Sequence, residues 1–300
     1  MKCTSPTPMT KTSDFQYHHG KNHDGTLFYR PCGQCMACRI SYAQQWAIRA
    51  THESQMHREN CFITLTYEED TPNRSLIPSD LSNFFRRLRY EKGKNFKYLA
   101  CGEYGTEGER PHYHALLFGL DFPRLKSQLV SENSSQCPEL YDLWKLGHVS
   151  IGNLTPETCN YVAQYSVKKI NGKNKDWHYK GRIPEFIRVS TGGIGKDYAL
   201  KYSSEILNRG YVQYLNEPAP LPRYYEKLYE KNNLLTPEYY ERKEQSLTDR
   251  IDFYALYAKQ LANYQKNKSR FSETENFGFN TYNKCANTHK RTQNENACHH

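Results

Sequence analysis

Two histidines separated by one residue are the first sign of chemistry in this chain of 300 residues. His112 and His114 lie in a run from Pro111 to Gly119 that is rich in β-favouring residues and reads as one strand. Because side chains alternate between the faces of a strand, both imidazoles fall on one face, about 6–7 Å apart along the backbone. They are close enough to bind one cation. The pair alone is equally compatible with two surface histidines on an edge strand, so its neighbours decide the interpretation.

A carboxylate is expected beside the pair. Leu99 to Tyr104 reads as the end of a preceding strand, and the run from Gly105 to Glu109 as the turn of an antiparallel hairpin. This hairpin would bring Glu103 next to the histidines, with Glu107 and Glu109 in the turn as competitors for the role. Two imidazoles and one carboxylate leave open positions on a divalent ion, which suits Mg²⁺ or Mn²⁺ beside a phosphate without excluding other metals.

A second informative stretch runs from residue 155 to 170 and is expected to be a helix. Thr155 is suited to the N-cap, Pro156 to the first helical position and Glu157 to the first turn, and Asn171-Gly172 would end the helix.

The faces of this helix differ in chemistry. Tyr161, Tyr165 and Lys168 gather on one side, and small or apolar residues gather on the other. The small face is the one expected to be buried, which sets the phenols apart beside a cation; surface tyrosines without function are the alternative. The apolar side comprises Cys159, Val162, Ala163, Ser166, Val167 and Ile170.

These parts suggest phosphoryl chemistry. A phenol has a pKa near 10 and is a weak nucleophile at neutral pH. A metal ion on the phosphate and a nearby lysine would stabilise the developing charge, so that a tyrosine could attack phosphorus and form a covalent phosphotyrosine. We expect Tyr165 to act first and Tyr161 second, with Lys168 steadying the phosphate.

The sequence resembles a known family at several points. His112-Tyr113-His114 resembles the His-hydrophobic-His signature of HUH endonucleases, although Tyr113 is bulkier than the usual aliphatic residue. The run from Val162 to Lys168 resembles the Val-x-x-Tyr-x-x-Lys motif of rolling-circle initiators. The runs Cys32-Gly-Gln-Cys-Met-Ala-Cys-Arg39 and Gln45-Trp-Ala-Ile-Arg49 are similar to the replication initiators of the gokushovirus branch of the microviruses.

The resemblance implies an activity. It implies a site-specific single-strand DNA endonuclease and strand transferase that initiates rolling-circle replication of a small circular phage genome. Origin DNA, single-stranded or supercoiled, would be the substrate, and a host helicase and polymerase would be partners in the cytoplasm of an infected bacterium. A relaxase or transposase with the same site chemistry is one alternative. A zinc-stabilised regulator that binds nucleic acid without catalysis is another.

A cysteine cluster suggests a separate metal site. Cys32, Cys35 and Cys38 have spacings suited to one structural Zn²⁺, which needs a fourth ligand. Cys3 or one of the histidines at 18, 19 and 23 could supply it. An iron–sulfur cluster can use similar spacing, but nothing else in the chain indicates redox chemistry. Thiols with no metal remain an alternative.

Composition agrees with a polyanionic partner. The formal net charge is +9, and 25 tyrosines offer flat faces for unpaired bases. The clustering of cysteines favours a reducing compartment over disulfides. No membrane span or signal peptide is expected, because no long apolar run exists.

Basic side chains are the expected DNA contacts. A helix capped by Ser79-Asp80 and stopped by Gly93 would carry the three arginines outward, although a solvated face explains them as well. The residues assigned to DNA binding are Arg86, Arg87, Arg89, Lys169 and Lys196.

Together the patterns predict an α+β fold of the HUH endonuclease type. We expect a central antiparallel sheet with the histidines in its middle, flanking helices, and a mainly helical C-terminal region. Four regions are expected: a Cys-rich segment and helix (1–58), the core (59–172), a basic connector and helical region (173–268), and a disordered tail (269–300).

Overall fold

The structure is a computed structural model that describes residues 3, 7–9, 28–69, 75–105, 109–123, 129–131, 134–168 and 175–242. One compact unit covers residues 33–239. In the other unit, the described part includes an antiparallel ribbon of β1 (Thr7–Met9) and β2 (Phe28–Arg30).

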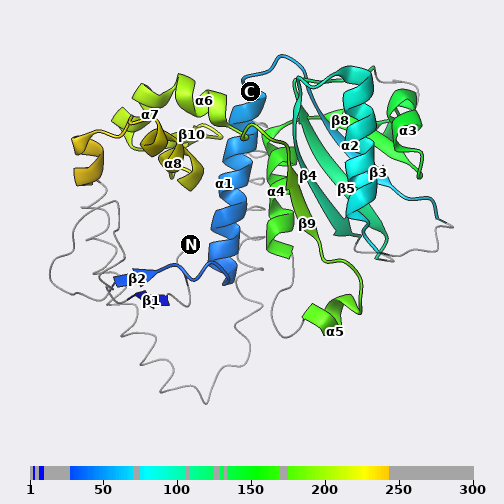
Figure 1. Cartoon of the computed structure of the whole chain (residues 1–300), viewed down its shortest axis with the longest axis horizontal. Coiled ribbons are helices and arrows are strands. Elements are labelled where there is room, and N and C mark those ends of the chain that lie inside the picture. Colours follow the sequence, from blue (N-terminus) through cyan, green and yellow to red (C-terminus); the bar gives the residue numbers. More distant parts are fainter. Residues whose placement is uncertain are drawn as a thin grey trace, which may run out of the picture. The chain divides into compact units, whose positions relative to one another are not determined.

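An antiparallel sheet forms the centre of the first unit (Figure 1). The strand order is β6-β7-β8-β3-β5-β4-β9, in which the five strands from β8 to β9 form the main part and β6 and β7 are short. This confirms the predicted α+β class, with the histidine strand β5 in the interior of the sheet. The strands are β3 (Asn60–Thr66), β4 (Lys97–Tyr104), β5 (Pro111–Phe118), β6 (Leu129–Ser131), β7 (Ser134–Ser135), β8 (Val149–Asn153) and β9 (Phe186–Val189).

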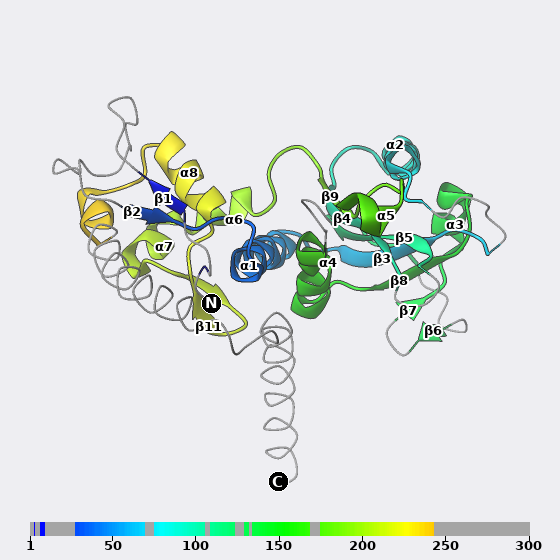
Figure 2. The same cartoon turned by 90° about the horizontal axis from the view of Figure 1, so that it is seen from below.

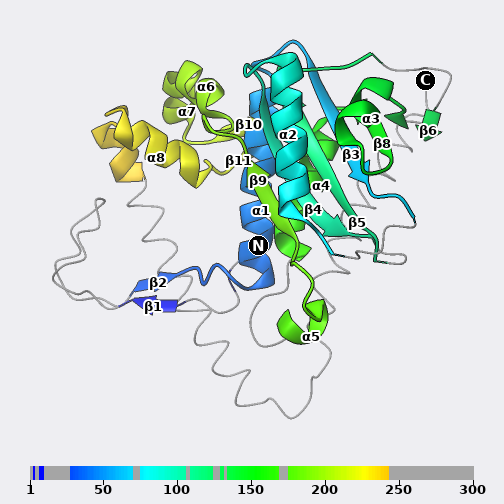
Figure 3. The ribbon, with the colours of Figure 1, turned by 45° about the vertical axis from the view of Figure 1, so that its right-hand side comes forward.

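Helices cover both faces of this sheet, as Figure 3 shows. On one face, α2 (Pro78–Lys92) and α3 (Pro138–Trp144) pack on Tyr113 and its neighbours in β5. On the other, α1 (Met36–Ser54) and α4 (Pro156–Lys168) pack on Leu116. Alternation along β5 therefore separates two cores.

Helix α4 lies between α1 and the sheet (Figures 1 and 2). Ala163 packs on Ala43 and Ala47 of α1, which lets the two helices approach closely. Tyr165, on the other side of α4, is only 2% exposed and packs in the core beneath the sheet. The expectation that both tyrosines stand away from the buried side was therefore wrong for Tyr165. A helix that is covered on two sides buries more than its small residues.

The N-terminus of α4 forms as the sequence predicts. Thr155 precedes the helix, and its Oγ1 accepts a hydrogen bond from the N–H of Thr158 at 3.3 Å. Pro156 occupies the first helical position, where its missing N–H has no helical partner to lose. The start of α2 differs from the prediction, because its N-cap is Ile77 and not Ser79-Asp80.

The histidine strand is also fixed from behind. The hydroxyl of Tyr113 accepts a hydrogen bond from the N–H of Ile77 at 2.7 Å and donates to the Ile77 carbonyl at 3.0 Å. It also lies 2.9 Å from the hydroxyl of Tyr67, which donates to Asp80 at 2.8 Å. The residue between the two histidines thus anchors β5 to the start of α2.

The described region after β9 is mainly helical. The sequence analysis did not single out most of these elements, and it read residues 218–222 as a linker. That reading was wrong in part, because β11 occupies 217–219 and Pro222 is the N-cap of α8. The predicted helix at 237–266 lies largely outside the described residues. The elements, including one before β9, are α5 (Lys175–Tyr179), α6 (Lys196–Lys201), α7 (Ser203–Arg209), β10 (Val212–Tyr214), β11 (Glu217–Ala219) and α8 (Arg223–Lys231).

The Gly-rich loop at 191–196 has a structural role. The N–H of Gly195 donates to the buried carboxylate of Glu53 in α1 at 2.6 Å. Its φ of +77° suits glycine, and an added Cβ would lie 2.3 Å from the hydroxyl of Tyr225. The opposite oxygen of Glu53 bonds Lys97 of β4 at 2.8 Å. This carboxylate therefore joins α1, β4 and the loop.

The close approach of α1 and α4 generates a first prediction. Replacing Ala163, which is fully buried, with leucine should overpack this contact and lower the free energy of unfolding by roughly 1–3 kcal/mol. Urea denaturation followed by circular dichroism measures it. Gln44→Leu on the exposed face of α1 is the matched control. Equal stability of Ala163→Leu and the control would contradict the contact.

Candidate metal and nucleophile site

Strand pairing brings three predicted ligands together. In the β4–β5 register Glu103 lies opposite His112, and in the β3–β5 register Thr64 lies opposite His114. Directly paired residues point to the same face, so these four side chains share the face that α4 covers. The hairpin predicted from the sequence is therefore present, and it selects Glu103 from the three candidate glutamates.

The contacts within this group are short. One carboxylate oxygen of Glu103, Oε1, lies 2.6 Å from Nε2 of His112 and 3.0 Å from Nε2 of His114. The ligand atoms of all three residues lie within 4.8 Å of one another. Glu103 and His114 are buried at 3% and 6% exposure, whereas His112 is partly exposed. The group is therefore reached from solvent on the His112 side.

The outer nitrogens of the imidazoles have their own partners. Nδ1 of His112 lies 3.0 Å from the carbonyl oxygen of Arg110, which can only accept, so Nδ1 carries the hydrogen. In a neutral imidazole this leaves the lone pair on Nε2, toward Glu103. Nδ1 of His114 pairs with Oγ1 of Thr64 at 2.9 Å. Partners of this kind orient metal-binding histidines.

Glu103 is held as a carboxylate. Burial raises its pKa, but hydrogen bonds and charge interactions with His112 and His114 outweigh this effect and lower the pKa to about 2. An ionised carboxylate and two imidazole nitrogens that converge on one point form a donor set of the kind that divalent cations bind. The residues therefore fit the predicted metal site.

Tyr161 contacts this group directly. Its hydroxyl donates to Oε1 of Glu103 at 3.3 Å and lies 3.4 Å from Nε2 of His114. The ring is 43% exposed and meets Phe62 of β3 edge to face. The pKa of Tyr161 is raised by burial, and the negative charge of Glu103 adds to this, although a hydrogen bond with Tyr165 lowers it.

Tyr165 lies one helical turn deeper. Its ring stacks on His114 with centroids 5.8 Å apart and meets Tyr161 edge to face at 5.0 Å. Burial is the main cause of its strongly raised pKa, to which the hydrogen bond with Tyr161 contributes. The sequence analysis put Tyr165 first, whereas the phenol beside the carboxylate is that of Tyr161.

The remaining site residues from the sequence are spread out. Lys168 ends α4, and Lys169 falls outside the described residues. Lys196 begins α6. Arg86, Arg87 and Arg89 belong to α2, on the face of the sheet opposite to the histidines.

Two of these arginines have internal contacts. Arg87 donates to the carbonyls of Leu143 at 2.7 Å and Trp144 at 3.1 Å, which ties α2 to α3. Arg89 places its guanidinium over the rings of Phe96 and Tyr98. Their assignment to DNA contact stays a prediction.

Sequence reasoning missed two residues that support the site. Thr64 and Phe62 of β3 contact His114, the first by its hydroxyl and the second by ring stacking at 5.4 Å. Period-two alternation puts both on one face of the strand, but only the β3–β5 pairing shows which face that is.

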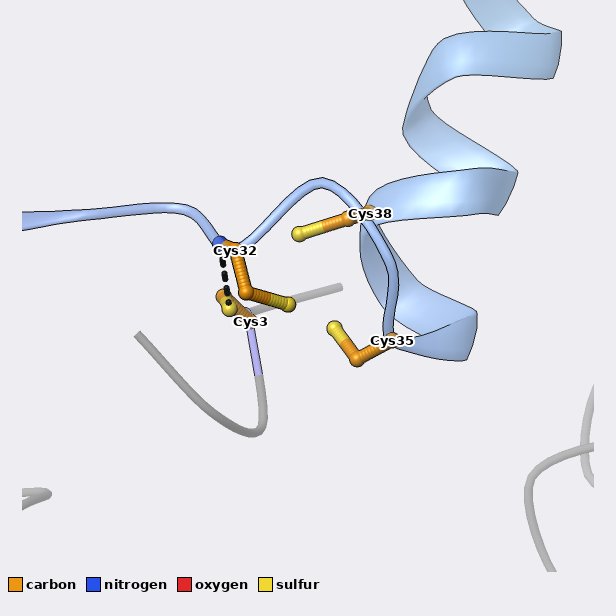
Figure 4. Close-up of side chains that lie close together, drawn as sticks. All are labelled: Cys3, Cys32, Cys35 and Cys38. Carbon is orange, nitrogen blue, oxygen red and sulfur yellow. Dashed lines mark hydrogen bonds between the residues drawn. The ribbon is translucent and has the colours of Figure 1, made fainter. Parts of the chain in front are cut away.

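A second group of metal-type ligands lies at the start of α1. The sulfur atoms of Cys3, Cys32, Cys35 and Cys38 lie within 4.8 Å of one another. Figure 4 shows the side chains of Cys32, Cys35 and Cys38 turned toward one another, with Cys3 beside Cys32. The structure thus favours Cys3 among the suggested fourth ligands; the histidines at 18, 19 and 23 lie outside the described residues.

Comparisons with known proteins point in the same direction as the site. A family model for phage replication-associated proteins of the ORF2 type matches residues 60–170. Replication-associated protein VP4 of Bdellovibrio phage phiMH2K is 32% identical, over 92% of this chain and 89% of its own length. Replication-associated protein ORF2 of Spiroplasma virus 4 is 30% identical, over 67% of this chain and 68% of its own length.

A third relative is more distant. Replication-associated protein ORF4 of Chlamydia phage 1 is 29% identical, over 75% of this chain and 59% of its own length. No solved structure matches significantly. Within the described residues, no helix combines the length and the apolar character that crossing a bilayer requires.

The converging ligands predict a measurable affinity for a divalent ion. Mn²⁺ should raise the midpoint of thermal unfolding, by about 2.7 kcal/mol in stability at a concentration 100-fold above its dissociation constant. Glu103→Ala should abolish this shift because it removes the anionic ligand. Differential scanning fluorimetry across a Mn²⁺ titration measures both.

The turn offers a matched control. Glu109 is an exposed carboxylate of the same hairpin that bonds Arg182 at 2.9 Å. Glu109→Ala should therefore keep the wild-type Mn²⁺ shift. Loss of the shift in Glu109→Ala with retention in Glu103→Ala would assign the ligand to the wrong glutamate.

Proposed function

Because this chain belongs to the family of phage replication-associated proteins, with the microvirus-type initiators, we propose that it nicks one strand of origin DNA through a covalent 5′-phosphotyrosine. The family assigns a role in phage replication. The nicking and strand-transfer chemistry is the proposal. It makes the chain a metal-dependent DNA endonuclease and strand transferase of the HUH type.

One observation carries the proposal: a partly exposed phenol lies at the ligand group. The hydroxyl of Tyr161 is 3.3 Å from Glu103 and 3.4 Å from His114, so a phosphate bound beside the histidines would meet a nucleophile. Proximity of this kind converts attack into an effectively intramolecular step. A nucleic-acid-binding regulator would have no need of this arrangement.

The reaction balances as a transesterification. The phenolic oxygen attacks the phosphorus of a phosphodiester and loses its proton, and the bond from phosphorus to O3′ breaks. The departing O3′ takes up a proton and becomes a 3′ hydroxyl, while the 5′ phosphate stays on the tyrosine. The number of phosphoester bonds is conserved, so the linkage can later be attacked by a 3′ hydroxyl.

The resting site keeps its phenols protonated. Burial raises the pKa of both Tyr161 and Tyr165, and the carboxylate of Glu103 adds to this. A divalent cation at Glu103, His112 and His114 would supply Lewis-acid stabilisation of negative charge on the phosphate. We propose Mg²⁺ or Mn²⁺, because both bind mixed carboxylate and imidazole sites that keep open positions.

The contacts favour an order for the two tyrosines. Tyr161 is exposed and touches the ligand group, whereas Tyr165 is buried behind it, so we propose that Tyr161 makes the first cleavage. This reverses the order expected from the sequence. Tyr165 would act in the second transfer, after the first tyrosine is occupied and the local packing has changed. Lys168, one turn further along α4, is proposed to steady the phosphate.

Other parts of the proposal concern DNA and partners. Arg86, Arg87, Arg89, Lys169 and Lys196 are proposed backbone contacts, which fits the net charge of +9. Synthesis from the new 3′ hydroxyl and unwinding of the duplex would be supplied by a host polymerase and helicase in the bacterial cytoplasm.

The test is an adduct assay on single-stranded origin DNA with Mn²⁺. Tyr161→Phe should lower the covalent protein–DNA product of the first cleavage by at least 100-fold, since phenylalanine removes the nucleophilic oxygen. Tyr165→Phe should form that adduct but fail to transfer the strand to a second oligonucleotide. Denaturing electrophoresis with labelled DNA reads out both products.

Three outcomes would contradict parts of this proposal. Adduct lost in Tyr165→Phe and kept in Tyr161→Phe would restore the order expected from the sequence. Adduct lost in neither single variant would mean that the tyrosines substitute for each other. Origin binding without any adduct or nick in the wild type would favour the non-catalytic regulator.

A further inference from the structure

We propose that Cys3, Cys32, Cys35 and Cys38 bind one Zn²⁺ as a tetrathiolate structural site. The proposal is independent of the nicking chemistry, because none of the four cysteines belongs to the group around Glu103. It concerns how the start of α1 is stabilised.

The spacing of the sulfur atoms fits one ion. Tetrahedral coordination with Zn–S bonds of about 2.3 Å places neighbouring sulfurs roughly 3.8 Å apart. The four sulfurs here lie within 4.8 Å of one another, so shifts of side-chain torsion angles suffice to bring them onto one cation (Figure 4). Three of them come from a run of seven residues, which fixes their mutual geometry locally.

The surroundings favour thiolates. Cys35 is the N-cap of α1 and Cys38 lies in its first turn, where the helix dipole stabilises negative charge and lowers thiol pKa values. The backbone N–H of Cys32 donates to the sulfur of Cys3 at 3.3 Å. Cys3 itself is 4% exposed, which is unusual for a residue so near the N-terminus and indicates that something holds it in place.

The donor set selects the metal. Four thiolates are soft ligands that favour zinc or iron over Mg²⁺ or Mn²⁺, so this site and the group around Glu103 should not compete for the same ion. A four-iron cluster binds each thiolate to a different iron atom and requires wider spacing than one ion does. Closed coordination by four protein ligands indicates a structural and not a catalytic role.

The site would affect the tyrosine helix indirectly. Helix α1 begins within the cysteine group and continues to Ala43, Ala47 and Ala50, which pack on α4. Metal binding to the folded state alone stabilises it, so removal of zinc should lower the midpoint of thermal unfolding.

The first experiment measures metal content. The full chain, purified without added metal and under reducing conditions, should contain one zinc per chain by inductively coupled plasma mass spectrometry. Cys35→Ser and Cys38→Ser should each reduce this at least tenfold. Cys137→Ser is the matched control, because Cys137 is a buried cysteine at the N-cap of α3, where serine is well tolerated.

A second measurement keeps the result interpretable if the variants fold poorly. Replacing zinc with Co²⁺ in the wild-type chain should give the strong visible bands of tetrahedral thiolate coordination. His112→Ala should retain the zinc, which separates this site from the proposed catalytic metal. A failed adduct assay would leave both readouts unchanged.

Several results would overturn the proposal. They are a wild-type chain with less than a tenth of an equivalent of zinc, iron in place of zinc, or a disulfide between two of these cysteines in peptide mass spectra. Zinc lost equally in Cys137→Ser would also overturn it, since the metal would then depend on the general state of the fold.

Discussion

One carboxylate oxygen connects the two histidines. Oε1 of Glu103 lies within hydrogen-bond distance of both imidazoles while its side chain is almost entirely buried. A buried charge is costly unless it is paired, so the two histidines are what make Glu103 tolerable in the sheet. The same pairing fixes the rotamers of all three side chains. Geometry around this oxygen therefore decides where a phosphate could bind and which tyrosine it would meet.

The backbone supplies that geometry through two registers. The β4–β5 pairing sets Glu103 across from His112, and the β3–β5 pairing sets Thr64 across from His114. A shift of either register by one residue would turn one partner to the opposite face. Helix α4 then closes the face, and its distance from the sheet depends on alanines that pack against α1. Small residues far from the phosphate site thus set the height of the tyrosines above it.

Much of this was accessible from the sequence, for identifiable reasons. The hairpin, the tyrosine helix and its cap depend on short-range patterns such as alternation, Gly-rich turns and Pro at the first helical position, and these were confirmed. The burial of Tyr165 was not predicted, because a helical wheel shows which residues share a side but not how many sides are covered. Thr64 was missed because its partner, His114, is 50 residues away and only the strand pairing joins them. The cap of α2 was misplaced because Pro78 begins that helix before the better capping residues Ser79 and Asp80.

The tyrosine between the histidines has a consequence for how this strand can vary. Tyr113 faces away from the metal ligands, yet its hydroxyl satisfies both the N–H and the carbonyl of Ile77 and lies against Tyr67. An aliphatic side chain here would leave two backbone groups at the start of α2 in need of water or a new partner. Positions 67, 77 and 113 therefore behave as one mechanical unit, and substitutions among them are expected to be tolerated in combination more readily than one at a time.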